Sequence, residues 1–165
     1  MENWIESGAG LFRTGKPATP DPHLVSYFLL LDKDHGQVLL VDHKKANLWL
    51  PAGGHVEVDE HPKETVEREI VEELGVQADF VSEKPFFLTV TLTKGHKGNH
   101  TDVSLWYILK ATVGNSFQYD EREFHDIRWF PINRIPFHKS DPHMSRLVQK
   151  LTLHKFIRKD PSVAR

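Results

Sequence analysis

Hydrophobic residues along this chain fall into short runs and alternating stretches, a pattern that indicates β-strands. Residues 24–31 (LVSYFLLL) form a continuous apolar run, which is typical of a buried strand. Residues 86–93 and 101–111 instead alternate, so every second side chain points to the same side of a strand. The turn-forming sequence DHG follows the first run and predicts a β-hairpin. The expected strands are residues 24–31, 37–41, 48–50, 86–93, 101–111 and 127–130.

One helix is expected at residues 61–74, where apolar residues recur every four positions. Pro62 suits the first turn, where a missing N–H has no cost, and Gly75 suits the end. The helix follows the sequence Pro51-Ala52-Gly53-Gly54, which predicts a loop whose backbone approaches a ligand or folds tightly back. The apolar side of this helix consists of Val66, Ile70 and Leu74.

A second helix is expected near the end of the chain. Asp141 is its predicted N-cap and Pro142 its first residue, because aspartate and proline favour these two positions. Strands, a helix, further strands and a final helix together predict a domain of the α+β or the α/β class. We expect residues 1–22, which end in a proline-rich stretch, to form an arm, and residues 23–160 to form one domain.

The first helix breaks a local rule of charge placement. Glu69, Glu72 and Glu73 stand at i, i+3 and i+4, where like charges cost about 0.2–0.5 kcal/mol per pair. Glu72 and Glu73 also lie in the last turn, where the helix dipole is already negative. Such a conflict is expected at a functional site, and a hard divalent cation with oxygen ligands would resolve it. A solvated acidic helix face is the alternative interpretation.

Composition excludes several classes of function. The net charge of −2 gives no general attraction to nucleic acid or to a membrane. Without cysteine the chain has no disulfide, no thiolate zinc site and no cysteine nucleophile. The eleven histidines are scattered and show no HExxH or comparable zinc spacing. No signal peptide and no run of membrane-spanning length is recognisable, so we expect a cytoplasmic protein.

The segment from Gly54 to Val76, GHVEVDEHPKETVEREIVEELGV, resembles the Nudix box, G-x(5)-E-x(7)-R-E-U-x-E-E-x-G-U, where U is aliphatic. All nine fixed positions match in one register, which is a specific signal. The resemblance implies a Nudix hydrolase with the Nudix α-β-α sandwich, a central mixed sheet between helices. It also implies hydrolysis of a nucleoside diphosphate linked to another group, with Mg²⁺ or Mn²⁺ bound.

The resemblance assigns roles to residues of the box. It implies that Glu72 and Glu73 bind metal and that Gly54 can offer a backbone carbonyl. Glu69 would be a metal ligand, a general base, or both. Glu60 would bind an outer metal ion or hold Arg68, and Arg68 would orient the carboxylates.

Further site residues are expected outside the helix. Many Nudix relatives take another acidic ligand from the loop before a late strand, and here we choose Glu123, with Glu121 in reserve. An exposed charged loop is the alternative. His100, which opens a strand, and His55 are candidates for contacts to the phosphates or as satisfied structural histidines. Aromatic residues that would stack on a base or belong to the core are Trp49, Phe87 and Trp106.

The substrate is inferred by elimination. ADP-ribose enzymes of the family often carry a proline near the position of Thr91, and dinucleoside polyphosphate enzymes a tyrosine near Thr93. Neither is present, which favours a MutT-like nucleoside triphosphate pyrophosphohydrolase. The alternatives are a hydrolase of ADP-ribose or another nucleotide sugar, and a domain that binds nucleotides without cleaving them. We expect a small-molecule nucleotide as the partner, with no nucleic acid and no membrane, and a monomer or homodimer.

Overall fold

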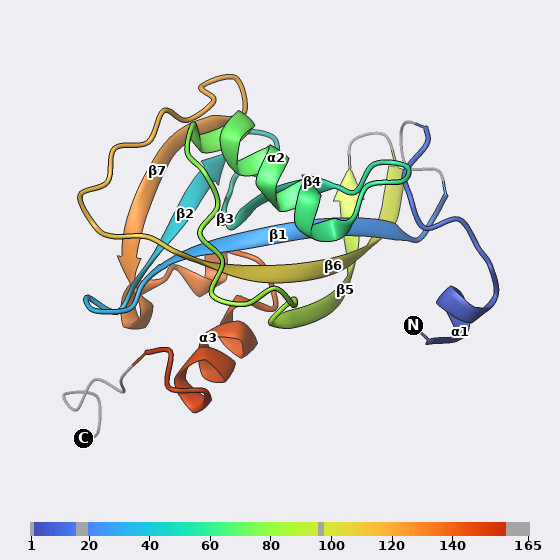
Figure 1. The fold of residues 1–165 in the computed structure, drawn as a ribbon. Helices are drawn as coiled ribbons and strands as arrows, with labels where there is room; N and C mark the ends of the chain where they lie inside the picture. The colour runs from blue at the N-terminus through green and yellow to red at the C-terminus, as the bar shows by residue number, and fades with distance from the viewer. Residues whose placement is uncertain (1, 16–19, 96–97, 158–165) are drawn as a thin grey trace.

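The computed structural model describes residues 2–15, 20–95 and 98–157 of the 165-residue chain, and a central β-sheet dominates it (Figure 1). None of the helices within these residues is long and apolar enough to cross a membrane. The elements are α1 (Glu2–Glu6), β1 (His23–Asp32), β2 (Gln37–His43), β3 (Leu48–Leu50), β4 (Ala52–His55), α2 (Pro62–Leu74), β5 (Phe87–Gly95), β6 (Gly98–Lys110), β7 (Phe124–Pro131), the 3-10 turns η1 (Ile132–Arg134) and η2 (Phe137–Lys139), and α3 (Met144–Leu153).

The sheet is mixed, as predicted, and the described residues form seven strands, one more than the six expected. Its main order is β3-β2-β1-β6-β5, with β4 also paired to β1 and β7 also paired to β2. Strands β1 and β6 run parallel, from His23 opposite Asp102 to Leu31 opposite Lys110, and the other pairs are antiparallel. Strand β1 lies inside the sheet, with β2 and β4 paired along one edge and β6 along the other, and its side chains enter a hydrophobic core on each face, as its continuous apolar run predicts.

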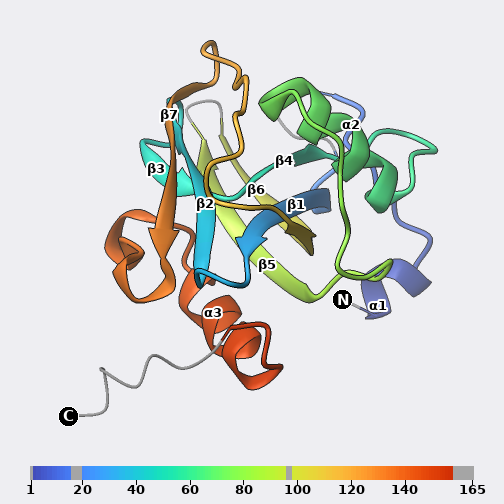
Figure 2. The ribbon, with the colours of Figure 1, turned by 60° about the vertical axis from the view of Figure 1, so that its left-hand side comes forward.

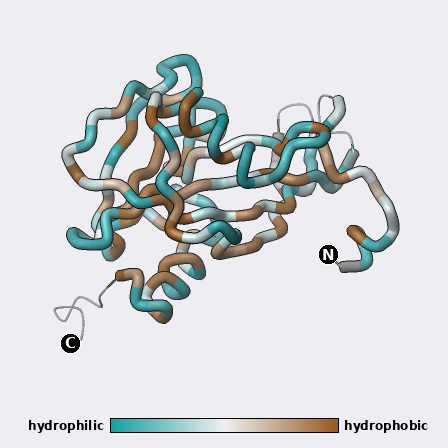
Figure 3. The backbone as a smooth tube through the Cα atoms, in the orientation of Figure 1, coloured by the Kyte–Doolittle hydropathy of each residue, from teal (hydrophilic) through white to brown (hydrophobic). Residues whose placement is uncertain are grey.

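Helices cover the two faces of the sheet, which confirms the expected α-β-α arrangement (Figure 2). Helix α2 packs Val66, Ile70 and Leu74 against one face, beside Phe28 and Leu30 of β1. Helix α3 closes the other face. Hydrophobic residues concentrate in the strands and hydrophilic ones in the connecting loops (Figure 3). The side chains of α3 within that second core are Met144, Leu147 and Leu151.

Two details differ from the sequence-based expectation, and a third was left open by it. The segment predicted as a glycine loop contains strand β4, because residues 52–55 pair with residues 25–28 of β1. Asp141 is not an N-cap: its carboxylate accepts from the His143 N–H at 2.7 Å within a preceding turn, and α3 begins only at Met144. In β5 the threonine side packs inward and the aliphatic side is exposed, up to 60 % at Leu92.

The N-terminal segment is connected to the sheet by a backbone hydrogen bond, in which the Leu24 N–H donates to the Leu11 carbonyl at 2.8 Å. The predicted boundary between arm and domain after residue 22 stays a prediction. Residues 158–160, the last of the predicted domain, lie outside the described residues.

Candidate active site

Helix α2 is fixed at both ends by its own sequence, and this fixes the positions of its acidic side chains. At its beginning, the Lys63 N–H donates to His61 Nδ1 at 3.1 Å, and the His61 N–H donates to Glu64 at 2.8 Å. At its end, Gly75 adopts the left-handed conformation (φ 68°), which glycine tolerates best. The helix therefore carries its glutamates on a rigid element.

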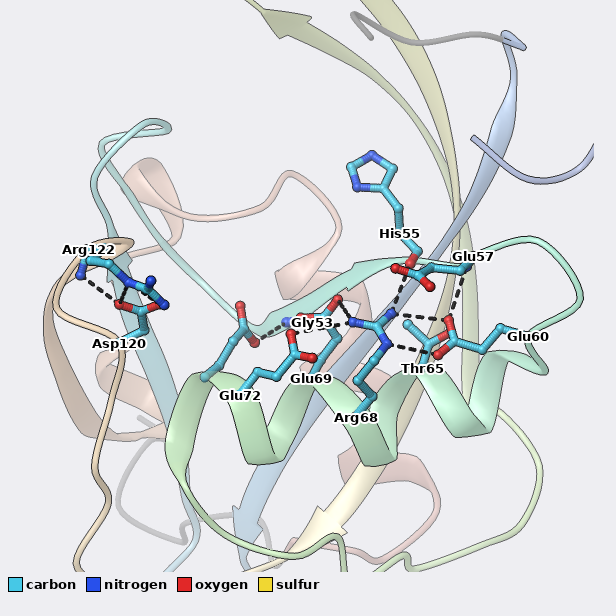
Figure 4. A network of polar contacts seen from close by, with 11 residues as sticks. Gly53, His55, Glu57, Glu60, Thr65, Arg68, Glu69, Glu72, Asp120 and Arg122 are labelled. Carbon is cyan, nitrogen blue, oxygen red and sulfur yellow. Dashed lines mark hydrogen bonds and ion pairs between the residues drawn. The ribbon is translucent and has the colours of Figure 1, made fainter. Parts of the chain in front are cut away.

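Arg68 holds two glutamates of the helix region in place (Figure 4). Its Nε donates to Glu60 Oε1 at 2.9 Å and its Nη2 to Glu60 Oε2 at 3.1 Å, a forked contact. Its Nη1 donates to Glu69 Oε1 at 2.7 Å. The structure thus brings together the three residues predicted as catalytic, and Arg68 neutralises part of the charge of Glu60 and Glu69.

Strand β4 passes close beneath the helix because two of its residues lack side chains. Gly53 has a φ of 142°, and a β-carbon there would collide with the backbone of β1. A β-carbon on Gly54 would collide with the Glu69 carboxylate. The Gly53 N–H donates to Glu73 Oε2 at 2.9 Å. The two glycines therefore let Glu69 and Glu73 lie against the strand, and the carbonyl role of Gly54 stays a prediction.

An open cavity of about 310 Å³ lies at the end of α2 that carries the acidic residues. Five of its six lining residues are acidic, and the sixth is an arginine already paired at 2.7 Å with Asp120. So much negative charge with so little compensation suits a hard cation that prefers oxygen ligands. The lining residues are Glu69, Glu72, Glu73, Asp120, Arg122 and Glu123.

Burial sets the charge state of the two innermost glutamates. Glu73 is only 7 % exposed, and burial, followed by the charge of Glu69, raises its pKa well above the ordinary value. Burial also raises the pKa of Glu69, although Arg68 opposes the effect. Glu73 therefore lacks the counter-charge that an ionised buried acid needs, Glu69 has it only in part through Arg68, and a bound divalent cation would supply the rest.

Glu60 has the opposite environment. Its carboxylate accepts from Arg68, from the Thr65 hydroxyl at 2.7 Å and from the Glu57 N–H at 3.0 Å. These hydrogen bonds, that of Arg68 first, lower its pKa from 4.5 to about 2. Glu60 in turn holds the pKa of the Arg68 guanidinium above its usual range. The pair is therefore fully charged at neutral pH.

Replacing Glu60 by glutamine should lower the stability of the metal-free protein in a pH-dependent way. A carboxylate whose pKa is lower in the folded state stabilises that state above its unfolded pKa of 4.5. This stabilisation is lost as the pH falls toward about 2. Solvent around Arg68 screens the pair, so we expect a loss of roughly 2 kcal/mol at pH 7. Urea unfolding with chelator, measured between neutral and strongly acidic pH, gives the difference.

Glu83, an exposed partner of Lys63, offers the matched control. Glu83→Gln should change the unfolding free energy little, because exposed ion pairs contribute little. A Glu60→Gln effect that stays constant across the acidic range would contradict the electrostatic explanation.

Of the two acidic residues predicted as ligands in the loop before β7, Glu123 lines the cavity and Glu121 does not. The backbone carbonyl of Glu123 accepts from the Lys44 N–H at 2.9 Å, which extends the pairing of β2 with β7 by one residue. The Asp120 N–H donates to the Glu73 carbonyl at 3.0 Å and ties the loop to the end of α2. Glu123 lines the cavity, whereas Glu121 is exposed outside it. The ligand role of Glu123 stays a prediction.

The aromatic candidates lie in the core on the α3 side of the sheet. Trp49 is 9 % exposed, packs edge-on against Phe130 and has the Arg128 guanidinium over its ring. Phe87 packs edge-on against the fully buried Trp106. None of the three lines the acidic cavity. Their packing has a structural explanation, and a role in substrate binding stays a prediction.

His55 and His100 also lie away from the glutamates, next to each other. Their ring centroids are 6.5 Å apart, and the ring of His23 lies 5.0 Å from His55 and 5.3 Å from His100. The side chain of His55 points away from the Arg68 network, while its carbonyl accepts weakly from Arg68 Nη2 at 3.4 Å (Figure 4). Burial, followed by the charge of Arg13, lowers the pKa of His55 to about 3.

Some residues of these groupings were not predicted from the sequence. Asp120 and Arg122 line the cavity and pair with each other, but a charged loop alone gives no signal for which of its residues face inward. His23 and Asp102 join His55 and His100 through strand pairing. The spacing His100-x-Asp102 was the one local signal, because alternate residues of a strand share a face.

Comparisons with known proteins agree with this geometry. A family model described as the NUDIX domain matches residues 22–151. The chain is 25 % identical over 130 residues to nucleoside diphosphate-linked moiety X motif 6 of Xenopus laevis, matching 77 % of this chain and 58 % of that protein. The chain therefore spans little more than half the length of this relative.

Solved structures share the fold at low sequence identity. A MutT NUDIX hydrolase from Burkholderia pseudomallei superposes with a TM-score of 0.65 at 19 % identity, covering 78 % of this chain and 97 % of that one. The NUDIX domain of Shewanella oneidensis NrtR, in complex with ADP ribose, superposes with a TM-score of 0.56 at 17 % identity. The match covers 79 % of this chain and 85 % of that one.

Proposed function

Because this chain belongs to the NUDIX family of hydrolases, we propose that it hydrolyses a diphosphate linkage in a nucleoside diphosphate derivative with Mg²⁺ bound by the acidic cavity. The observation that carries the proposal is the cavity itself, which gathers Glu69, Glu72, Glu73 and Glu123 at the end of α2. Mn²⁺, which also takes oxygen ligands, could replace Mg²⁺.

The residues fit a magnesium ion on chemical grounds. Mg²⁺ binds through a few carboxylates and completes its shell with water and substrate phosphate. Glu73, nearly buried and close to three other carboxylates, lacks a cationic partner among the described residues. When bound, the metal would neutralise the phosphates and polarise the bridge between them.

The chain's own residues would position and activate the reactants. Glu72 and Glu73 would bind metal from the last turn of α2, and Glu123 would bind from the opposite loop. Glu69 is the candidate general base, since its raised pKa favours acceptance of a proton from the attacking water. Arg68, held by Glu60, keeps the Glu69 carboxylate in a fixed orientation. Its role is therefore to position Glu69 and not to contact substrate.

Among substrates, we propose a nucleoside triphosphate. Water would attack one phosphorus, the bridging P–O bond would break, and the products would be a nucleoside monophosphate and inorganic diphosphate (pyrophosphate). The proposal follows from the absence at Thr91 and Thr93 of the marks of other subfamilies. Two alternatives to this substrate and activity are tested as well: cleavage of a nucleotide sugar, and nucleotide binding without cleavage. The NrtR domain, which has the same fold, was solved in complex with ADP ribose.

A panel of nucleoside diphosphate derivatives tests the function. Nucleoside triphosphates, ADP-ribose, other nucleotide sugars and dinucleoside polyphosphates are incubated with Mg²⁺, and the products are resolved by mass. Reactions in ¹⁸O-labelled water identify the phosphorus that is attacked. We expect one class to turn over, and a chelator to abolish that turnover. Glu73→Gln protein purified in parallel controls for contaminating phosphatase.

The panel also separates the alternatives. Cleavage of ADP-ribose but not of triphosphates would keep the hydrolase and replace the substrate. Nucleotide binding without turnover above the Glu73→Gln background would show a binding domain and overturn the catalytic proposal.

A further inference from the structure

A second cluster of ligand-forming side chains lies on the opposite face of the sheet from α2. Strands β4, β1 and β6 run side by side, with His55 opposite Val25 of β1 and Asp102 opposite His23. His23 and Val25 are two residues apart, as are His100 and Asp102, so each pair shares one face of its strand. The strand register therefore gathers three histidines and one aspartate from three strands.

The four side chains are close enough to share one ion. Each offers one ligand atom, and these atoms all lie within 4.8 Å of one another. Asp102 Oδ1 is 3.2 Å from His23 Nε2 and 3.4 Å from His100 Nε2. Ligand atoms about 2.1 Å from a tetrahedral Zn²⁺ are roughly 3.4 Å apart. Two of the separations thus already match a zinc site, and small side-chain rotations would bring in the rest.

The hydrogen bonds around the cluster prepare its atoms for a metal. His23 Nδ1 lies 2.9 Å from the Pro20 carbonyl, which can only accept, so Nδ1 carries a proton, and in the neutral ring Nε2 keeps a free lone pair. Asp102 Oδ2 accepts from the Thr93 hydroxyl at 2.6 Å, which orients Oδ1. Outer hydrogen bonds of this kind fix the tautomer and direction of metal ligands.

Three of the inward-facing atoms lack partners despite their burial. His23 Nε2, His55 Nε2 and Asp102 Oδ1 make no hydrogen bond among the described residues. His23 is fully buried and Asp102 is 5 % exposed. Leaving buried polar atoms unpaired costs about 1–3 kcal/mol each. With His23 neutral, its Nε2 and Asp102 Oδ1 are two acceptor atoms 3.2 Å apart, which repel each other unless a proton or a metal cation lies between them.

We propose that His23, His55, His100 and Asp102 bind one Zn²⁺ ion, at a site distinct from the magnesium site of α2. Three imidazole nitrogens and one carboxylate suit Zn²⁺, whereas Mg²⁺ prefers oxygen. Four protein ligands leave no open position, so the ion is structural and not catalytic. It fastens β4 to β1 and β6 and steadies His55, whose carbonyl contacts Arg68.

Cobalt binding tests the site, because tetrahedral Co²⁺ absorbs visible light far more strongly than octahedral Co²⁺. The full chain is freed of metal and titrated with Co²⁺, then Zn²⁺, in millimolar Mg²⁺ that occupies the carboxylates. We expect tetrahedral bands that saturate at one ion per chain and disappear when Zn²⁺ is added. His100→Ala, at a partly exposed position, and Asp102→Asn should each weaken binding more than about tenfold.

His138, exposed in η2, supplies the matched control, and His138→Ala should bind like the original chain. Circular dichroism checks that each variant is folded. Should a variant not fold, NMR of the original chain decides: Zn²⁺ should shift the ring protons of His23, His55 and His100 and leave those of His138 unchanged. Octahedral Co²⁺ only, unchanged binding in both folded variants, or unshifted rings at these three histidines would overturn the proposal.

Discussion

Glu73→Gln is expected to reduce kcat by more than about 100-fold, since even residues outside the ligand shell of a metal cost about 10–100-fold. Glutamine can still accept the hydrogen bond from the Gly53 N–H, so the local structure should persist. The substitution does remove the negative charge that a divalent cation needs from its ligand. Steady-state kinetics on the best substrate of the panel, over a range of Mg²⁺ concentrations, measure the loss.

The same variant should keep or raise its melting temperature without metal. In the original chain a nearly buried carboxylate faces Glu69, Glu72 and Glu123, and their repulsion is removed with the charge. Saturating Mg²⁺ should stabilise the original chain and not the variant, because a ligand bound by the folded state alone stabilises it.

Glu67→Gln provides the control on the same helix. Glu67 is half-exposed and pairs with Lys63, away from the cavity. Its variant should keep both activity and the response to Mg²⁺. Near-normal turnover of Glu73→Gln would remove the metal-ligand assignment, and a large loss of metal-free stability would show that Glu73 serves the fold instead.

The elements that the sequence predicted well are those that local chemistry determines. The predicted bounds of helix α2 are wrong by only one residue, at its start, and its end at Leu74 was predicted correctly. The signals that set these bounds, the capping residues with Pro62 and Gly75, all lie next to the helix in the sequence. Strand β3 matches at both ends. Strand β4 was missed because its two glycines indicate a loop, and its strand conformation depends on pairing with a distant part of the chain.

The acidic site was predictable for a related reason. Glu69, Glu72 and Glu73 lie within one helix, so their spacing alone places them together. The histidine cluster was not predictable, since residues 23, 55 and 100 meet only through the register of three strands. The predicted start of α3 was wrong because Asp141-Pro142 fits both a helix start and a turn, and packing decides between the two.

Glu123→Gln is expected to lower kcat by about 10–100-fold, and Glu121→Gln to leave it close to normal. Both acids belong to the loop before β7, but only Glu123 lines the cavity that it shares with the α2 glutamates. Its backbone is fixed by the hydrogen bond from the Lys44 N–H, so its side chain cannot easily exchange places with that of Glu121. Steady-state kinetics and equilibrium unfolding of both variants provide the comparison.

The comparison of kinetic constants identifies what Glu123 does. A contact made only in the transition state should reduce kcat and kcat/KM equally, whereas one that serves ground-state binding should raise KM alone. If Glu123→Gln leaves kcat unchanged and Glu121→Gln lowers it strongly, the loop adopts another register when substrate binds. If both variants are silent, the glutamates of α2 complete the metal site by themselves, and the loop is ordinary charged surface. Unfolding free energies close to those of the original chain would assign any loss to the chemistry, because neither side chain belongs to the core.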